Sequence, residues 1–541
     1  MAPGHPALPS PKRRRHQPGG PVFTNPQLER NLQTPETPSH VDLHGHAYGY
    51  YASSWARKAG NGSFPNVGEP PEFVKTRLEA YRLLDFKPML NTASYVNVVG
   101  EPQEWEIANE GLKINIADQT IYPGSQKMHD DCLQMVADLW NLPMSEKDNG
   151  VPGTCTVGST EACLLAGLAL KFRWRAWYAQ KKNLTAGQAR RAFPNLVIST
   201  LYQAAWEKFF KYMDVEPRFI QGKVQDFTLD PTKIEAVADE NTIGIVCILG
   251  NHYSGHFDEV HIVDEICEKL NREKGWNLGI HVDAASGGFI APFQRYAPPW
   301  DFRLKNVLSI SASGHKFGLS CIGTGWVVWR SREGLSEHVA TSVSYLGGKA
   351  DSYTLNFSRP ASGVSVQFYK FLRLGREGYS RLVDNTMFVA EFIRNGLRNF
   401  RDAKTKLPVF RILDFGGGEC CLPVVAAQLN TAIGYPFTDV DMQHVLAERH
   451  WYVGSYRMSF THPLDEVEMS LFEDEAYNST MFRVVVKVNL TMDLAKDLLS
   501  AFGEALNFLG QHSAGYRRVL HGGGDVGDSK EVRDEALHPP C

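Results

Sequence analysis

The most informative parts of this chain are two short stretches, His281-Val-Asp-Ala-Ala-Ser-Gly-Gly288 and Ser311-Ala-Ser-Gly-His-Lys-Phe317. In the first, an apolar strand ends at Asp283 and small residues follow. In the second, another strand ends in small residues, directly before His315 and Lys316. Ligands of open α/β sheets bind at the carboxyl ends of the strands. The two stretches therefore predict a binding site at one sheet edge, with a carboxylate and an amine at neighbouring strand ends.

Asp283 and Lys316, which are 33 residues apart, have two interpretations. They can form a buried ion pair. Alternatively, they can hold pyridoxal phosphate, with the lysine as its Schiff-base partner and the aspartate beside the pyridinium nitrogen. Only a primary amine forms an exchangeable imine with an aldehyde. Only an anion beside the ring nitrogen keeps the ring protonated and therefore an electron sink. These two stretches alone leave both interpretations open.

A third stretch, Gly153-Thr-Cys-Thr-Val-Gly-Ser-Thr-Glu-Ala162, runs into a helical pattern from Cys163 to Trp177. A glycine and two hydroxyls at a helix start form an anion site, because free N–H groups and the helix dipole point at the ligand. Taken alone, Ser159 is equally explained as a helix cap, with Glu161 favoured in the first turn by the same dipole. Together with Asp283 and Lys316, the stretch supplies a phosphate anchor.

Short, nearly continuous apolar runs surround these stretches, as expected for strands that helices cover on both faces. Amphipathic segments such as Asp258 to Arg272 alternate with them. The pattern predicts an α/β fold with a mostly parallel sheet, then a long helix from about Val364 to Phe400 and a smaller α+β domain. The expected strands of the main sheet are Asn195–Thr200, Thr242–Leu249, Leu278–Asp283, Val307–Ser311 and Gly325–Trp329; those of the smaller domain lie in Cys420–Leu429 and Phe482–Val488.

The composition excludes several classes of protein. The chain has 541 residues, 43% of them apolar, and a formal net charge of −4, which argues against a generally basic nucleic-acid binder. No apolar run approaches the roughly 18 residues that cross a membrane. The nine cysteines include no C-x-x-C pair, so neither a disulfide scaffold nor a cysteine zinc site is expected. We expect a cytoplasmic protein.

Both ends of the chain have the composition of disordered tails. The first 40 residues contain nine of the 30 prolines and the basic cluster Lys12–Arg15, which is either a nuclear address or a solvated tail. After Tyr516, three successive glycines and scattered charges predict a flexible end.

The motifs together resemble the glutamate decarboxylases and, more broadly, the fold-type-I pyridoxal-phosphate decarboxylases, from about Pro70 to Leu509. Gly-Ser-Thr-Glu-Ala162, Asn356-Phe-Ser-Arg-Pro360 and the two opening stretches carry the resemblance. It implies a cofactor domain with a seven-stranded type of sheet, a smaller C-terminal domain and a homodimer or larger assembly of dimers. The expected segments are a disordered tail (1–45), a helical segment (46–110), the cofactor domain (111–375), the small domain (376–515) and a flexible tail (516–541).

The resemblance also implies roles for individual residues. Lys316 is expected to be the Schiff-base lysine and Asp283 the pyridinium partner, with Gln203 and Ala285 on opposite faces of the ring. Ser358 matches a phosphate contact across the dimer interface, and Arg483 matches the arginine near the substrate α-carboxylate. The remaining phosphate-binding positions are Ser159, Thr160, Ser313 and His315. No partner cluster of acids or histidines surrounds His315, so no metal site is expected.

The chain departs from the family in the region that recognises the substrate. Ser94-Tyr95 and His129 replace other residues near the expected distal-carboxylate site, and His252 replaces a small residue near the cofactor hydroxyl. A hydroxyl, a phenol and an imidazole all suit an anionic group. Ser94, Tyr95 and His129 are therefore expected to line the substrate pocket, unless Tyr95 and His129 only line the subunit interface.

From these features we expect decarboxylation of L-glutamate to 4-aminobutyrate and carbon dioxide. Two alternatives remain open from the sequence. One is another reaction on the same cofactor, such as decarboxylation of aspartate or cysteine sulfinate, or transamination. The other is a non-catalytic relative that acts as a binding protein, although the retained Lys316 and Asp283 argue against it.

Overall fold

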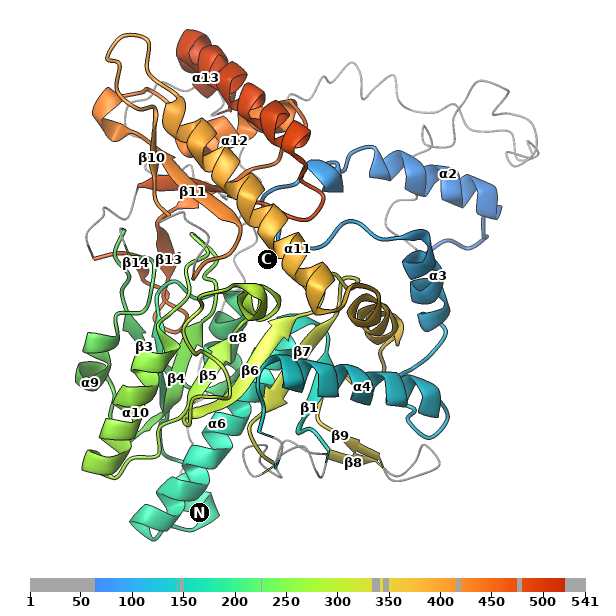
Figure 1. Cartoon of the computed structure of the whole chain (residues 1–541), viewed down its shortest axis with the longest axis vertical. Coiled ribbons are helices and arrows are strands. Elements are labelled where there is room, and N and C mark those ends of the chain that lie inside the picture. The colour runs from blue at the N-terminus through green and yellow to red at the C-terminus, as the bar shows by residue number, and fades with distance from the viewer. Residues whose placement is uncertain are drawn as a thin grey trace, which may run out of the picture. The chain divides into compact units, whose positions relative to one another are not determined.

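The computed structural model describes residues 64–143, 145, 150–224, 226–332, 341–343, 350–414, 420–473 and 479–520 (Figure 1). The predicted N-terminal tail with its basic cluster, and residues 521–541 of the predicted C-terminal tail, lie outside these ranges. The chain divides into two compact units, one up to Asp85 and one from Phe86. No helix among the described residues is long and apolar enough to cross a membrane.

The described part of the first unit is built around helix α2 (Pro71–Arg82). Proline suits the first helical position, because its missing N–H would have no partner within the helix there. Arg77 Nη2 lies 2.8 Å from Glu69 Oε2, and Lys75 and Glu79 are one helical turn apart. Charged pairs of this kind stabilise an exposed helix modestly.

The second unit contains a seven-stranded sheet with the strand order β1-β7-β6-β5-β4-β2-β3. Strand β7 runs antiparallel to β6 and β1, while the neighbours from β6 to β3 are parallel. The predicted mostly parallel sheet is therefore confirmed. Its strands are β1 (Gly153–Thr156), β2 (Asn195–Ser199), β3 (Glu216–Ile220), β4 (Thr242–Ile248), β5 (Ile280–Asp283), β6 (Val307–Ser313) and β7 (Gly325–Trp329).

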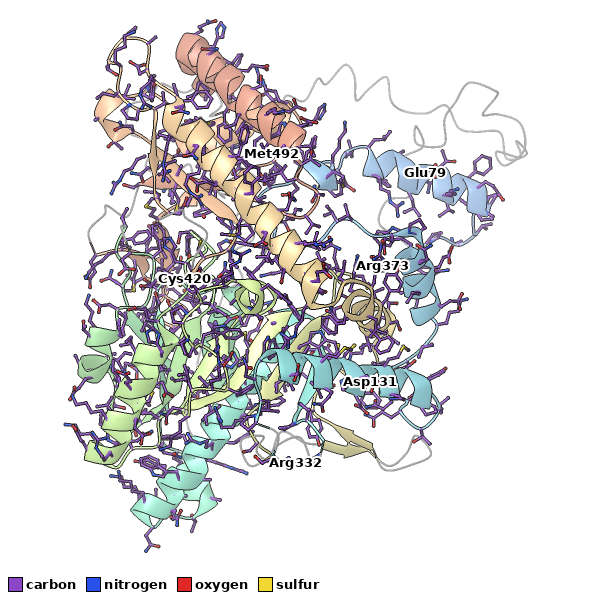
Figure 2. The ribbon with its side chains drawn as sticks, in the orientation of Figure 1. Glu79, Asp131, Arg332, Arg373, Cys420 and Met492 are labelled. Atoms are coloured by element: carbon purple, nitrogen blue, oxygen red, sulfur yellow. The ribbon has the colours of Figure 1, made fainter. Side chains whose placement is uncertain are left out.

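Helices cover both faces of this sheet (Figure 1). Successive side chains of a strand point to opposite faces. In β2, Leu196 and Ile198 pack with α6 (Gly158–Lys182) and α8 (Ala204–Met213), whereas Val197 packs with α4 (Pro123–Leu139) and α10 (Val260–Lys274). Figure 2 shows the side chains that fill the space between these helices and the sheet.

A second, four-stranded antiparallel sheet follows the long helix α11 (Ser362–Asn399). Arg394 of α11 joins the two, because its side chain pairs with buried Asp414 and donates to the carbonyl of Val424 at 3.1 Å. The sheet has the order β10 (Phe410–Ile412), β11 (Val424–Leu429), β15 (Thr480–Val485) and β12 (Gly454–Arg457), and packs against α12 (Asp439–Glu448) and α13 (Met492–Leu520). The other elements are α3 (Pro102–Gly111), α7 (Ala186–Ala189), α9 (Ile234–Val237), β8 (Thr341–Val343), β9 (Ala350–Ser352), β13 (Ser459–Thr461) and β14 (Glu468–Ser470).

Candidate active site

Asp283 ends strand β5 with both carboxylate oxygens held. Its Oδ2 accepts a hydrogen bond of 2.8 Å from the indole Nε1 of Trp206, and its Oδ1 accepts one of 3.1 Å from the backbone N–H of Ala285. The residue is 4% exposed. Hydrogen bonds to an ionised group stabilise its charged form and fix its direction. Asp283 is therefore a fixed carboxylate at the carboxyl edge of the sheet.

Lys316 lies on the turn that follows the neighbouring strand β6. Its Nζ donates to Ser286 Oγ at 3.2 Å and lies 5.2 Å from the centre of the Tyr95 ring. The two turns are joined, because the N–H of Ser313 donates to the carbonyl of Ala285 at 3.1 Å. The structure thus brings the predicted amine and carboxylate to adjacent turns, as the order of the strands requires.

The start of helix α6 lies beside the same turn. Ser313 Oγ donates to Ser159 Oγ at 2.8 Å, and Thr160 follows in the first helical turn. Gly158 has φ +76°, and a Cβ atom there would lie 3.2 Å from Cε1 of His315. Amide groups in the first turn of a helix have no partner within the helix and favour anions. Hydroxyls and amides therefore converge on a place that suits a phosphate group.

Two histidines, the buried His281 and the partly buried His315, flank these groups as neutral rings. Burial lowers the pKa of His281 to about 4 and that of His315 to about 4, the latter assisted by the charge of Lys316. His281 lies between the hydroxyls of Ser309 and Ser311, at 2.8 and 3.1 Å. His315 Nδ1 donates to the carbonyl of Thr324 at 2.7 Å, so its Nε2 gains a proton only if the ring is charged. An anion bound beside His315 would favour that charged form.

A second cation, Arg483 of strand β15, lies against the other polar residues of the site. Its guanidinium carbon is 4.7 Å from the centre of the Tyr95 ring, and the residue is fully buried. Nη2 donates to the carbonyl of Ala93 at 2.9 Å, and Nη1 donates to that of His252. Nε is buried without a hydrogen-bond partner, and no carboxylate of the described residues pairs with this arginine, which donates to two carbonyls. A buried cation that meets only neutral groups suits an incoming carboxylate.

The remaining predicted residues lie at the edges of this group or away from it. Gln203 is the partly buried residue before α8, and Ala285 is buried on the turn after Asp283. Ser94 Oγ accepts the N–H of Val96 at 3.2 Å. Ser358 is exposed and accepts from Asn115 Nδ2 at 3.3 Å, so the structure does not bring it to the phosphate side of its own chain.

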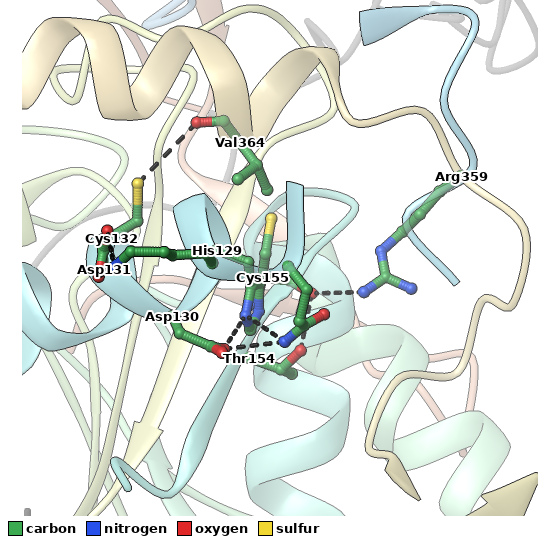
Figure 3. A network of polar contacts seen from close by, with 10 residues as sticks. His129, Asp130, Asp131, Cys132, Thr154, Cys155, Arg359 and Val364 are labelled. Carbon is green, nitrogen blue, oxygen red and sulfur yellow. Dashed lines mark hydrogen bonds and ion pairs between the residues drawn. The ribbon is translucent and has the colours of Figure 1, made fainter. Parts of the chain in front are cut away.

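His129 has different partners from those that we expected (Figure 3). Its Nε2 accepts the backbone N–H of Cys155 at 3.0 Å, and its Nδ1 lies 2.9 Å from Asp130 Oδ1. The ring is buried and lies 5.9 Å from that of Trp326 on β7. Both ring nitrogens are thus occupied by groups of the chain itself.

Sequence reasoning missed the part played by Trp206. The stretch Tyr202–Trp206 drew attention to Gln203, but it is the tryptophan that contacts Asp283. A fully buried tryptophan requires a partner for its N–H, which was the available signal. Only the fold shows that this partner lies at the end of β5.

A protein-family model described as "Pyridoxal-dependent decarboxylase conserved domain" matches residues 86–408. The chain belongs to the pyridoxal-dependent decarboxylases. A "Probable glutamate decarboxylase gamma" of Listeria monocytogenes is 37% identical over 441 residues, covering 81% of this chain and 86% of its own length. "Glutamate decarboxylase" of Lactococcus lactis subsp. lactis is 36% identical over 418 residues, covering 77% and 84%. The solved structure "Lactobacillus brevis CGMCC 1306 Glutamate decarboxylase" matches with a TM-score of 0.75 and 33% identity, covering 85% of this chain and 97% of that one.

The residues of this decarboxylase fit pyridoxal 5'-phosphate. The amine of Lys316, the fixed carboxylate of Asp283 and the anion-binding start of α6 are the three groups that the aldehyde, the ring nitrogen and the phosphate need. Gly158 keeps the phosphate end open, because a side chain there would press on His315.

Proposed function

We propose that this pyridoxal-phosphate enzyme decarboxylates L-glutamate to 4-aminobutyrate and carbon dioxide. One observation carries the proposal: Lys316 Nζ and the guanidinium of Arg483 both lie against the ring of Tyr95, at 5.2 and 4.7 Å. An amino acid whose amine is held at Lys316 can then place a carboxylate at Arg483. The names of the bacterial relatives and of the matched solved structure support glutamate as the substrate.

When bound, the cofactor supplies a positively charged conjugated ring that accepts the electron pair released as carbon dioxide leaves. Asp283 keeps the ring nitrogen protonated, while Trp206 and Ala285 N–H hold that carboxylate in place. Lys316 carries the reactive amine, Gln203 and Ala285 contact the ring faces, and Ser358 reaches the phosphate in the partner subunit's site. The start of α6 binds the phosphate with Ser159, Thr160, Ser313 and His315.

Arg483 is proposed to hold the substrate α-carboxylate. Its two bonds to the carbonyls of Ala93 and His252 fix the plane of the guanidinium, and its buried Nε remains for the ligand. Holding the scissile bond in one direction relative to the ring is the geometric requirement of decarboxylation. The hydroxyl of Ser94 is proposed to face the distal carboxylate. Tyr95, whose phenol donates to the carbonyl of His252 at 3.2 Å, is proposed to line the substrate pocket with its ring.

We propose that the enzyme is a homodimer in the cytoplasm. An apolar cavity of about 660 Å³ opens among exposed apolar side chains, namely Trp105, Leu112 and Ile322, which are 56%, 65% and 75% exposed. Contiguous exposed apolar surface marks an interaction site. The eight cysteines of the described residues are free thiols, which suits a reducing compartment. Residues 111–375 are proposed as the cofactor domain and 376–515 as the smaller domain.

The test is to incubate the purified protein with pyridoxal phosphate and single amino acids, and to measure carbon dioxide and primary amine. We expect glutamate to exceed tyrosine and tryptophan by at least about a hundredfold in kcat/KM, because buried polar groups left unpaired reject such analogues. If the enzyme turns over aspartate or cysteine sulfinate in preference to glutamate, that amino acid replaces glutamate as the proposed substrate. Formation of an oxo acid without carbon dioxide would overturn the reaction type.

A further inference from the structure

Three side chains from different parts of the chain hold the end of strand β1, directly before α6 begins. Figure 3 shows two of them, His129 and Arg359, at Cys155. His129 Nε2 accepts the N–H of Cys155 at 3.0 Å, and Arg359 Nη2 donates to the carbonyl of Cys155 at 3.3 Å. Glu161 Oε2 accepts the N–H of Val157 at 2.6 Å. The N–H and carbonyl of Cys155 and the N–H of Val157 are therefore all bound to side chains, which restricts the conformation of this turn.

His129 acts here as a hydrogen-bond acceptor, which requires a particular state of the ring. Since Nε2 accepts an N–H, the proton of the neutral ring is on Nδ1, where it is donated to Asp130 Oδ1 at 2.9 Å. Packing near Trp326 and burial fix the orientation of the ring. A ring engaged at both nitrogens has no donor left for the distal carboxylate of a substrate.

Glu161 and Arg359 connect the same turn to the loop that carries Ser358. The second oxygen of Glu161 accepts the N–H of Asn356 at 2.9 Å, and Arg359 Nη1 donates to Thr354 Oγ1 at 3.1 Å. Glu161 is 4% exposed, so both of its bonds are shielded from water. Bonds to a charged acceptor in such surroundings are the stronger kind.

We propose that His129, Glu161 and Arg359 are positioning residues that hold the turn at residues 155–157 so that the start of α6 is shaped for the cofactor phosphate. This inference rests on the proposed cofactor role of α6, and it gives His129 a task in cofactor binding instead of substrate recognition. None of the three side chains needs to touch the phosphate. Each acts through the backbone that leads to Gly158, Ser159 and Thr160.

The experiment compares His129→Leu, which removes the acceptor at similar size, with His129→Gln, whose amide oxygen can replace Nε2. Lys127→Ala is the matched control on the same helix, because Lys127 forms only an exposed ion pair with Asp131, 2.9 Å away (Asp131 is labelled in Figure 2). Two quantities are measured: pyridoxal-phosphate affinity by absorbance titration of the apoprotein, and hydrogen exchange of the peptide spanning residues 153–161 in the apoprotein.

We expect His129→Leu to weaken cofactor affinity by at least about fivefold, the scale of one lost bond to a buried N–H. It should also speed exchange in the 153–161 peptide, while the glutamate KM at saturating cofactor changes by less than about twofold. His129→Gln should restore affinity and exchange, and Lys127→Ala should change neither.

Two results would overturn the inference. One is a raised glutamate KM with unchanged cofactor affinity, which would return His129 to the substrate site. The other is a lower Tm with unchanged affinity and exchange, which would leave His129 a purely structural role. If the wild-type protein binds the cofactor but does not act on glutamate, the proposed substrate fails while this comparison still holds. If it binds no cofactor, the proposed function fails, and exchange in the apoprotein alone decides whether His129 holds the turn.

Discussion

At the scale of single residues, the direction of the Asp283 carboxylate depends on the indole of Trp206. Trp206→Phe removes the 2.8 Å hydrogen bond to Oδ2 while keeping an aromatic ring in the core. We expect kcat/KM to fall about tenfold, because a hydrogen bond to a charged group contributes roughly 1.5–3 kcal/mol and about 1.36 kcal/mol is tenfold in rate. Trp177→Phe on helix α6, which is only partly buried, is the control. Equal losses in both variants would show that Trp206 acts only through packing.

The assignment of Lys316 has a rival in Lys487. Burial lowers the pKa of Lys487 to about 8, and its Nζ is buried without a hydrogen-bond partner, so it too is poised to react with an aldehyde. We expect the cofactor-loaded protein to be yellow and Lys316→Ala to lose that absorbance, whereas Lys487→Ala keeps it. Borohydride reduction followed by peptide mass mapping identifies the modified lysine. A pyridoxyl adduct on Lys487 would refute the assignment.

At the scale of elements, the start of α6 combines a helix N-terminus with a left-handed glycine. Gly158→Ala forces a side chain into φ +76° and places its Cβ 3.2 Å from the His315 ring. Gly434→Ala, at φ +71° with open space around the Cβ, is the matched control. Each variant should lose about 1 kcal/mol of stability to backbone strain. Only Gly158→Ala should also weaken cofactor affinity, by about tenfold, since its Cβ displaces a proposed phosphate ligand. Equal affinities in a fluorescence titration would remove the anion role from this helix start.

Many of the elements could be predicted from the sequence, because they have a local signal. The apolar runs predicted β2 and β4 to β7, and the amphipathic segment from Asp258 predicted α10. The sequence did not reveal β1 (Gly153–Thr156) as a strand, because its four residues merge into the glycine-containing turn before α6. It also did not reveal β3 (Glu216–Ile220), whose two charged residues and proline weaken the apolar pattern.

At the scale of the whole molecule, the substrate side of the site joins segments that are far apart in the chain. Arg483 of the four-stranded sheet donates to Ala93, 390 positions earlier, and lies against Tyr95, which also contacts Lys316 of the large sheet. No local sequence pattern predicts that residues so far apart in the chain lie in contact. The role expected for Arg483 came from resemblance, and those expected for Tyr95 and His129 came from resemblance together with the chemistry of their side chains. For His129 the fold supplies other partners at Cys155 and Asp130.

The proposed dimer predicts what happens when a charge is placed on the apolar surface around the cavity of about 660 Å³. Ile322 lines this cavity and is 75% exposed, so an aspartate there should leave the fold of the single chain intact. Burying that charge in an interface is costly, and we expect Ile322→Asp to raise the dimer dissociation constant by at least about tenfold. Tyr296→Asp, at a residue 71% exposed and outside the cavity, is the control. Sedimentation across a concentration series measures the dimer dissociation constant of both variants.

Cofactor affinity gives a second test, because Ser358 is proposed to complete the partner subunit's phosphate site. In Ile322→Asp, cofactor affinity should fall together with dimerisation. In Tyr296→Asp, neither cofactor affinity nor dimerisation should change. A variant that stays dimeric at wild-type affinity would place the interface elsewhere.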